Sequence, residues 1–136
     1  DRDLFLTRQE SRNIFKKLLD PTRTGGMKFY NNPLYLNFLQ GDREYQCTAW
    51  PNPTYTVLGW RKPCYPLADE HVQDVNELYE AGLWQKYGVG NDPRCANCMM
   101  HCGFESATIF QAISTPKDWA TLIKSGAAHK GGITAA

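Results

Sequence analysis

The chain has 136 residues, enough for one domain with a hydrophobic core of its own. Fifteen Lys and Arg against fourteen Asp and Glu leave a formal charge of +1, so no charge excess points to a nucleic acid or an anionic bilayer as partner. A hydrophobic fraction of 42% excludes a disordered chain, and no apolar run approaches the ~18 to 20 residues that span a bilayer. Because the chain begins with Asp1 and shows no signal-peptide pattern, we expect it to be part of a longer protein.

Two helices are predicted in the first third of the chain. The first covers residues 8–19, where Thr7 and Glu10 have the spacing of a capping box. The second is a short aromatic helix at residues 34–40, preceded by Asn32 as its N-cap. Its aromatic and leucine side chains predict a face that is buried against another element.

The middle of the chain predicts one hairpin and one helix. Residues 47–66 are rich in proline and contain a β-prone run at 54–60, which favours a strand or hairpin with a cysteine on either side. Apolar residues at spacings of three and four then predict an amphipathic helix from about Asp69 to near Gly82.

The last third predicts a loop, two helices and a tail. The glycine-rich segment 87–93 lacks the third glycine of a dinucleotide site and the Lys-Ser/Thr of a P-loop, so we interpret it as a plain loop. Helices are expected at about 103–113 and again from Thr115, and the small, polar residues 126–136 are expected to fray. The predicted fold class is therefore α+β.

Five cysteines are the residues with the clearest chemical potential. Cys95 and Cys98 form a Cys-x-x-Cys pair, and Cys102 follows four residues later, so three thiols can converge locally. Cys47 and Cys64 flank the predicted hairpin, which can bring them together, with Gly59 relieving backbone crowding near the second. Clustered thiolates suit zinc or an iron–sulfur cluster rather than magnesium or calcium.

Several interpretations of the cysteines stay open at this point. A lone Cys47 or Cys64 can be a small core residue, and His101 is a further candidate ligand. A zinc ion held by Cys64, Cys95, Cys98 and Cys102 would make a non-catalytic structural module. A thioredoxin-type pair lacks the strand that should lead into Cys95, and a secreted disulfide scaffold disagrees with the odd cysteine count and the absence of a glycosylation sequon.

The cysteine spacing resembles that of a known family. Cys47-x11-Gly59-x4-Cys64 is similar to the opening of the C-terminal extension of radical S-adenosylmethionine (SAM) enzymes, called SPASM or, in its half-sized form, twitch. In the half-sized form a Cys-x-x-Cys pair, here Cys95 and Cys98, completes the site of one auxiliary 4Fe-4S cluster. The next cysteine follows Cys98 after three residues rather than the five of the full pattern, so a second auxiliary cluster is not expected.

A closer resemblance, to the C-terminal region of the adenosylhopene transferase family of hopanoid biosynthesis, covers most of the chain. Four segments carry it: NPLYLNFL (32–39), YQCTAWPNPT (45–54), GWRKPCY (59–65) and CANCMMHCGFE (95–105). The resemblance implies that residues 1–26 end a radical SAM partial (β/α) barrel, that 27–114 form a helix-rich, cysteine-rich extension, and that 115–136 form a terminal helix and tail. The metal ligands would come from a set of five residues, namely Cys47, Cys64, Cys95, Cys98 and Cys102.

The resemblance also implies an activity that belongs to a larger enzyme. An upstream Cys-x3-Cys-x2-Cys loop would hold a second 4Fe-4S cluster and S-adenosylmethionine, and the 5′-deoxyadenosyl radical would add to hopene. The present residues would hold the auxiliary cluster and help to cover the active site, with no catalytic residue of their own. The expected partners are the barrel, hopene, and an electron donor such as flavodoxin or ferredoxin, and the expected location is cytoplasmic, at the membrane periphery.

Aromatic and basic residues near the cysteines have two possible uses. The chain contains four Trp, seven Tyr and six Phe, which could line a pocket for a large apolar substrate or simply fill the core. Arg61 and Lys62, next to Cys64, could be cations that tune a cluster, or solvated side chains.

Overall fold

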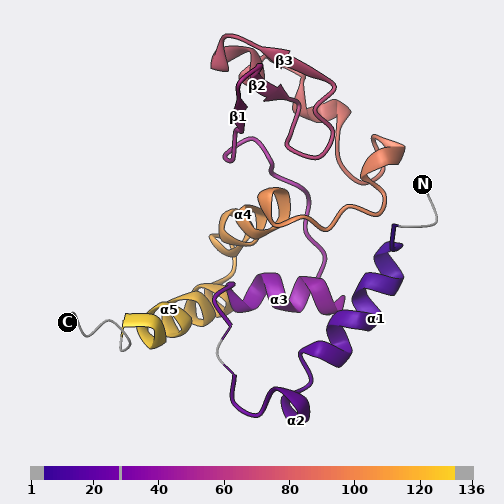
Figure 1. Ribbon diagram of the computed structural model, residues 1–136. Helices are drawn as coiled ribbons and strands as arrows, with labels where there is room; N and C mark the ends of the chain where they lie inside the picture. Colours follow the sequence, from indigo (N-terminus) through magenta and orange to yellow (C-terminus); the bar gives the residue numbers. More distant parts are fainter. Residues whose placement is uncertain (1–4, 28, 131–136) are drawn as a thin grey trace.

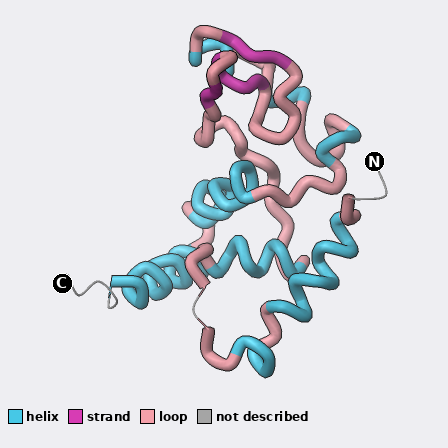
Figure 2. The backbone as a smooth tube through the Cα atoms, in the orientation of Figure 1, coloured by secondary structure: helices cyan, strands magenta, loops and turns pink. Residues whose placement is uncertain are grey.

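The computed structural model describes residues 5–27 and 29–130, which form five α-helices and one three-stranded antiparallel sheet (Figure 1). The helices are α1 (Arg8–Leu18), α2 (Pro21–Thr24), α3 (Pro33–Gln40), α4 (His101–Ala112) and α5 (Pro116–Lys130). The strands are β1 (Tyr55–Thr56), β2 (Gly59–Lys62) and β3 (Glu70–Val72), and short 3-10 helices are η2 (Val75–Tyr79), η3 (Trp84–Lys86) and η4 (Pro93–Cys95). The α-helices gather at one end and the sheet at the other, with long loops between them (Figure 2). This confirms the α+β class.

The first helices begin where the sequence predicts. The Thr7 hydroxyl accepts from the Glu10 backbone N–H, and the Glu10 carboxylate accepts from the Thr7 backbone N–H, so α1 has a complete capping box. The Asn32 side chain accepts from the backbone N–H of Tyr35 at the start of α3. Gly41 ends α3 in the left-handed conformation, with φ of 83°, which glycine adopts without a steric penalty.

The hairpin predicted at 54–60 is present, and a third strand extends it. Tyr55 pairs with Trp60 across β1 and β2, and β2 pairs antiparallel with β3. Gly59 has a φ of 122°, and a Cβ there would lie 2.6 Å from the carbonyl oxygen of Val72. The need for glycine therefore comes from β3, and the expectation that Gly59 relieves crowding near Cys64 was wrong.

The prediction of one amphipathic helix from Asp69 to Gly82 was also wrong. Its first residues form β3, because their backbone groups pair with β2. Asp74 then acts as an N-cap, with Glu77 completing a capping box, so the helical segment η2 starts only at Val75 and ends at Tyr79. The three- and four-residue spacing that suggested one helix instead spans a strand and a short 3-10 turn.

The two C-terminal helices agree with the prediction at their starts. α4 covers the predicted 103–113 segment within two residues, and Pro116 opens α5. α5 extends to Lys130, so residues 126–130 are helical where fraying was expected. The rest of the predicted tail, 131–136, lies outside the described residues. No described helix is long and apolar enough to cross a membrane.

The core lies between α3 and α4. Phe38 and Phe104 are both buried and stack with ring centroids 4.4 Å apart. Phe15 of α1 packs against them from the other side. Of the aromatic residues considered for a substrate pocket, Tyr35 and Phe38 belong to the core, Trp60 is half-buried, and Phe29, Tyr30, Trp50 and Tyr55 are exposed.

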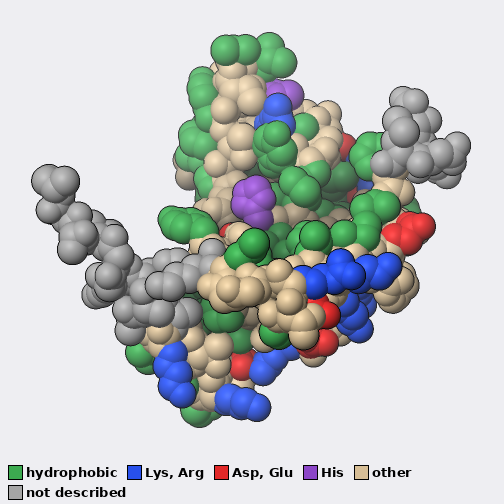
Figure 3. All heavy atoms as spheres, turned by 60° about the horizontal axis from the view of Figure 1, so that its bottom comes forward, with side chains coloured by type: hydrophobic (Ala, Val, Ile, Leu, Met, Phe, Trp, Pro, Cys, Tyr) green, Lys and Arg blue, Asp and Glu red, His purple; other side chains and the backbone are tan. Residues whose placement is uncertain are grey.

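The charged side chains do not form a patch of one sign on the face drawn in Figure 3. Basic and acidic groups lie next to one another over the helical end, whereas apolar and uncharged groups dominate the sheet end. The view agrees with the near-neutral composition.

Candidate functional site

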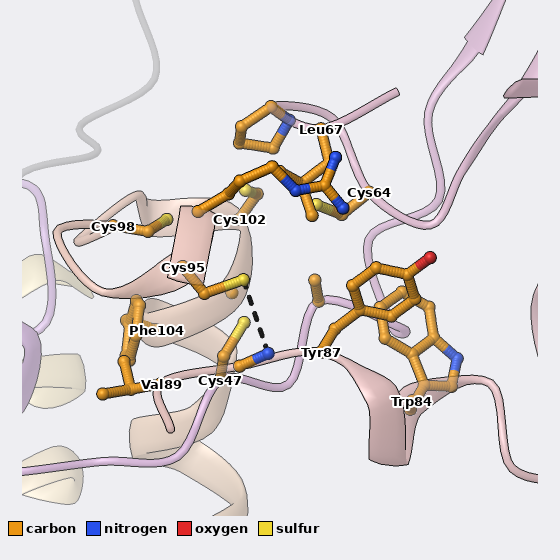
Figure 4. Close-up of a pocket in the computed structure, with 15 residues that line it drawn as sticks. Cys47, Cys64, Leu67, Trp84, Tyr87, Val89, Cys95, Cys98, Cys102 and Phe104 are labelled. Atoms are coloured by element: carbon orange, nitrogen blue, oxygen red, sulfur yellow. Dashed lines mark hydrogen bonds between the residues drawn. The ribbon is translucent and has the colours of Figure 1, made fainter. Parts of the chain in front are cut away.

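All five cysteines line a single pocket, between the helical end and the sheet (Figure 4). They come from three places in the chain: the segment before β1 carries Cys47, the segment after β2 carries Cys64, and the others lie between η4 and the first turn of α4. The empty space is about 620 Å³, part of which is open to solvent. The tertiary structure therefore brings together residues up to 55 positions apart.

Cys47 is held against α4 by its backbone neighbours. The Thr48 N–H donates to the carbonyl oxygen of Gly103 at 2.9 Å, and Ser106 Oγ donates to the carbonyl of Thr48 at 2.9 Å. These bonds place the Cys47 sulfur directly over Gly103, where there is no side chain. A residue with a Cβ at that position would displace the sulfur.

The downstream cysteines form a turn followed by a helix. The Cys98 N–H donates to the Cys95 carbonyl at 3.1 Å, which closes the Cys-x-x-Cys turn. Cys102 lies in the first turn of α4, whereas Cys98 precedes that helix. The three thiols line the same pocket, as the sequence predicts. They are brought together by a turn that leads into a helix, because Cys98 and Cys102 do not share one helix.

The glycine-rich segment that the sequence left without a function forms a wall of the pocket. Gly88 and Val89 line the pocket together with the cysteines, and the Gly88 N–H donates to the Cys95 sulfur at 3.4 Å. Backbone N–H groups that reach a cysteine sulfur are a common feature of iron–sulfur sites, where they tune the cluster. A sequence containing Gly-Val-Gly shortly before Cys-x-x-Cys offers only a weak signal for this contact.

Burial raises the pKa of most of the cysteine thiols that line the pocket. Burial is the larger cause, and neighbouring thiols add to it; together they raise the pKa of Cys64 to about 11 and that of Cys47 to about 12. The residue Cys47 is exposed to solvent overall. Its sulfur lies next to Gly103, and the residue lines the pocket. Burial also raises the pKa of Cys95 and Cys102. These raised pKa values favour neutral thiols, and a metal group must displace their protons when it binds.

The donor set consists of thiols, which suit zinc or an iron–sulfur cluster. All five thiols are free, so no disulfide competes for them. Tetrahedral zinc, with Zn–S bonds of about 2.3 Å, requires its sulfurs about 3.8 Å apart. No group of three or more Cys, His, Asp or Glu side chains in residues 5–27 and 29–130 has the spacing for one metal ion.

The cations predicted beside the site have other partners. Arg61 lies over the ring of Tyr65, and Lys62 pairs with Glu70 and Glu80. Neither lines the pocket, and His101 lies outside it at the start of α4.

Two other arginines, for which no sequence pattern suggested a role, contact the pocket or the turn that carries Cys98. Arg94 lines the pocket and is neutralised by Asp69 and Asp92, with N–O distances of 2.6 and 2.7 Å. Arg8 donates to the carbonyl oxygen of Cys98 at 2.7 Å. No local motif predicts the Arg8 contact, because the two residues are 90 positions apart.

Fold and pocket together define a small α+β domain with a five-thiol site suited to a thiolate-ligated metal group. The family model that matches residues 1–122 is described as a domain of unknown function, DUF3463. The chain belongs to this family. No curated protein and no solved structure matches the chain.

Proposed function

We propose that this chain is the cysteine-rich C-terminal part of a radical SAM enzyme and that it holds an auxiliary 4Fe-4S cluster on four of its five cysteines. The observation that carries the proposal is the convergence of Cys47, Cys64 and the 95–102 cysteines on one pocket. Thiolates are the ligands of such clusters, and the pocket supplies more than the four that one cluster needs.

The pocket walls support the same proposal. Apolar groups, among them Leu67, Trp84 and Val89, surround the thiols, and the Gly88 N–H points at a sulfur. Burial and N–H donors of this kind control the potential of a cluster and keep solvent from it. A bound cluster would supply one-electron chemistry, and the residues of this chain would bind it, orient it and limit the access of water.

The finer part of the proposal is the reaction. We propose an enzyme that transfers the 5′-deoxyadenosyl group to hopene, in which S-adenosylmethionine and the first cluster bind to a partial (β/α) barrel that ends near residue 26. The support is the resemblance of residues 32–39, 45–54, 59–65 and 95–105 to the adenosylhopene transferase family. In this proposal the present residues cover the barrel and contain no catalytic group.

Anaerobic purification of the protein expressed from its complete gene tests the cluster. We expect a brown protein that bleaches on reduction and holds about eight iron and eight sulfide per chain, which is enough for an auxiliary 4Fe-4S cluster beside the upstream one. About four of each would mean that this chain holds no auxiliary cluster. A colourless protein with one zinc per chain would support the structural-module alternative instead, and a protein without metal would refute both. The enzyme proposal is tested separately by the upstream coding sequence, because it fails if no Cys-x3-Cys-x2-Cys motif precedes this region.

A further inference from the structure

Arg8 opens helix α1 and reaches the turn that carries Cys98. Its backbone N–H donates to Asn97 Oδ1 at 3.2 Å, and its Nη2 donates to the carbonyl oxygen of Cys98 at 2.7 Å. N–H groups in the first turn of a helix have no partner within that helix, so Asn97 supplies an acceptor that α1 needs. Two hydrogen bonds from one residue therefore join α1 to the Cys-x-x-Cys turn.

The side chain of Arg8 is enclosed by the core. Only 14% of it is exposed, and its guanidinium lies 5.4 Å from the ring centroid of Phe38 and 5.2 Å from that of Phe104. The next residue along the turn is held as well, because Tyr35 Oη donates to the carbonyl of Met99 at 2.9 Å. Three successive residues, 97–99, thus have a bonding partner in α1 or α3.

Arg8, Arg12 and Glu44 form a charged group with a net positive charge. Arg8 and Arg12 both pair with Glu44, whose side chain is 62% exposed, so two cations share one carboxylate. Burial lowers the pKa of Arg8, and the neighbouring Glu44 carboxylate opposes this shift. Because Arg8 Nη2 bonds to the carbonyl oxygen of Cys98, the charge of the guanidinium lies beside the residue that carries this sulfur.

We infer that Arg8 is a positioning residue for the cluster: it holds the turn that carries Cys98, and its positive charge makes the bound cluster easier to reduce. This inference rests on the proposed function. Reduction adds one electron, delivered by an external donor of the flavodoxin or ferredoxin class, and so adds one negative charge to the cluster. A nearby cation stabilises that charge and raises the reduction potential.

The test compares four variants of the protein expressed from its complete gene and purified without oxygen. Arg8→Gln removes the charge, Arg8→Lys keeps it, and Arg12→Gln removes an equal charge that does not bond to the 97–99 turn. Glu44→Gln removes the exposed carboxylate and leaves the cations uncompensated. Iron and sulfide per chain, the midpoint potential from an EPR-monitored redox titration, and urea unfolding are measured for each.

We expect Arg8→Gln to hold at most half of the auxiliary-cluster iron of the wild type, counted beyond the upstream cluster, and the auxiliary cluster that remains to be reduced at a more negative potential. Arg8→Lys should keep a midpoint closer to the wild type. Arg12→Gln should retain its iron and shift the midpoint by less than half as much as Arg8→Gln. Glu44→Gln should shift the midpoint in the opposite direction, to a more positive value.

Wild-type iron content and midpoint in Arg8→Gln would overturn the inference, as would an equal shift in Arg12→Gln. If Arg8→Gln does not fold, Glu44→Gln decides, because an unchanged midpoint there contradicts a role for the local charge. A wild-type protein without iron would remove the proposed function together with this inference. A wild-type protein with a cluster and an unaltered Arg8→Gln variant would remove this inference alone.

Discussion

The sulfur of Cys47 occupies the space beside Gly103 that a side chain would fill. A Cβ built on Gly103 would overlap that sulfur, while its distance to the Cβ of Ala49, 3.7 Å, is an ordinary contact. Gly103 lies in the first turn of α4, where alanine is the better helix former, and its backbone has no positive φ. Glycine is therefore required here by the approach of Cys47 and by nothing in its own conformation.

Replacement of Gly103 by alanine tests this contact. Overpacking costs about 1–3 kcal/mol, which exceeds the roughly 1 kcal/mol gained in helix propensity, so we expect Gly103→Ala to lower the free energy of unfolding of the reduced, metal-free protein. In a Cys47→Ala background the same change should be stabilising, because the sulfur is gone and the propensity gain remains. Urea unfolding of the four proteins measures both effects. The same sign in both backgrounds would contradict the contact.

The pKa of Cys64 predicts how the metal-free protein responds to alkali. Burial raises the pKa of this thiol to about 11, above its value in the unfolded chain. Its contribution to stability is full below the unfolded pKa, near about 8.5, and is lost as the pH rises through the folded pKa.

Cys64→Ala removes this dependence. Between pH 8 and pH 11 the wild type should lose about 1–2 kcal/mol more of its free energy of unfolding than Cys64→Ala does, a figure reduced from the full pKa difference because the partly exposed thiol is screened by solvent. Urea unfolding under reducing conditions measures this. Parallel curves for the two proteins would show that the thiol is ionised as readily in the folded state as in the unfolded one.

The ion pair between Arg43 and Asp118 joins the loop after α3 to α5. Arg43 Nη1 lies 2.6 Å from Asp118 Oδ2, and Asp118 is only 3% exposed. Arg43→Met leaves a buried carboxylate without its cation and should cost about 2–4 kcal/mol in unfolding free energy.

Two control variants make this prediction specific. The double variant Arg43→Met with Asp118→Asn should be more stable than Arg43→Met alone, because it no longer buries an unpaired charge. Arg23→Met, at an exposed arginine of α2, should change the unfolding free energy by less than about 0.5 kcal/mol. A double variant less stable than Arg43→Met would mean that Asp118 stabilises the fold without Arg43.

The five cysteines exceed the need of one cluster, and the pattern of the half-sized extension leaves Cys102 as the spare residue. We expect Cys98→Ser to lose the auxiliary iron and Cys102→Ser to retain it, since Cys47, Cys64, Cys95 and Cys98 complete the spacing of a half-sized extension. Iron and sulfide analysis of both variants, expressed from the complete gene, measures this. Auxiliary iron retained in Cys98→Ser would remove this ligand assignment.

The sequence by itself determined the elements whose ends depend on local chemistry. Thr7 with Glu10 and Asn32 with Pro33 mark helix starts because capping bonds join residues two or three positions apart. Cys95, Cys98 and Cys102 could also be chosen as candidates from their spacing, since three thiols within eight residues are not typical of packing. The stretch after Asp69 was misjudged because its first residues pair with β2, a contact that periodicity does not reveal.

Only the tertiary structure decided how the site is built. The convergence of Cys47 and Cys64 with the 95–102 turn needs the chain to fold back over more than 30 residues, and spacing alone does not encode that path. The same holds for Arg8, which the sequence places far from every cysteine and which the packing of α1 on the core brings to Cys98. Capping and spacing act over a few residues, whereas the position of a charge beside a thiol depends on which faces the hydrophobic core brings together.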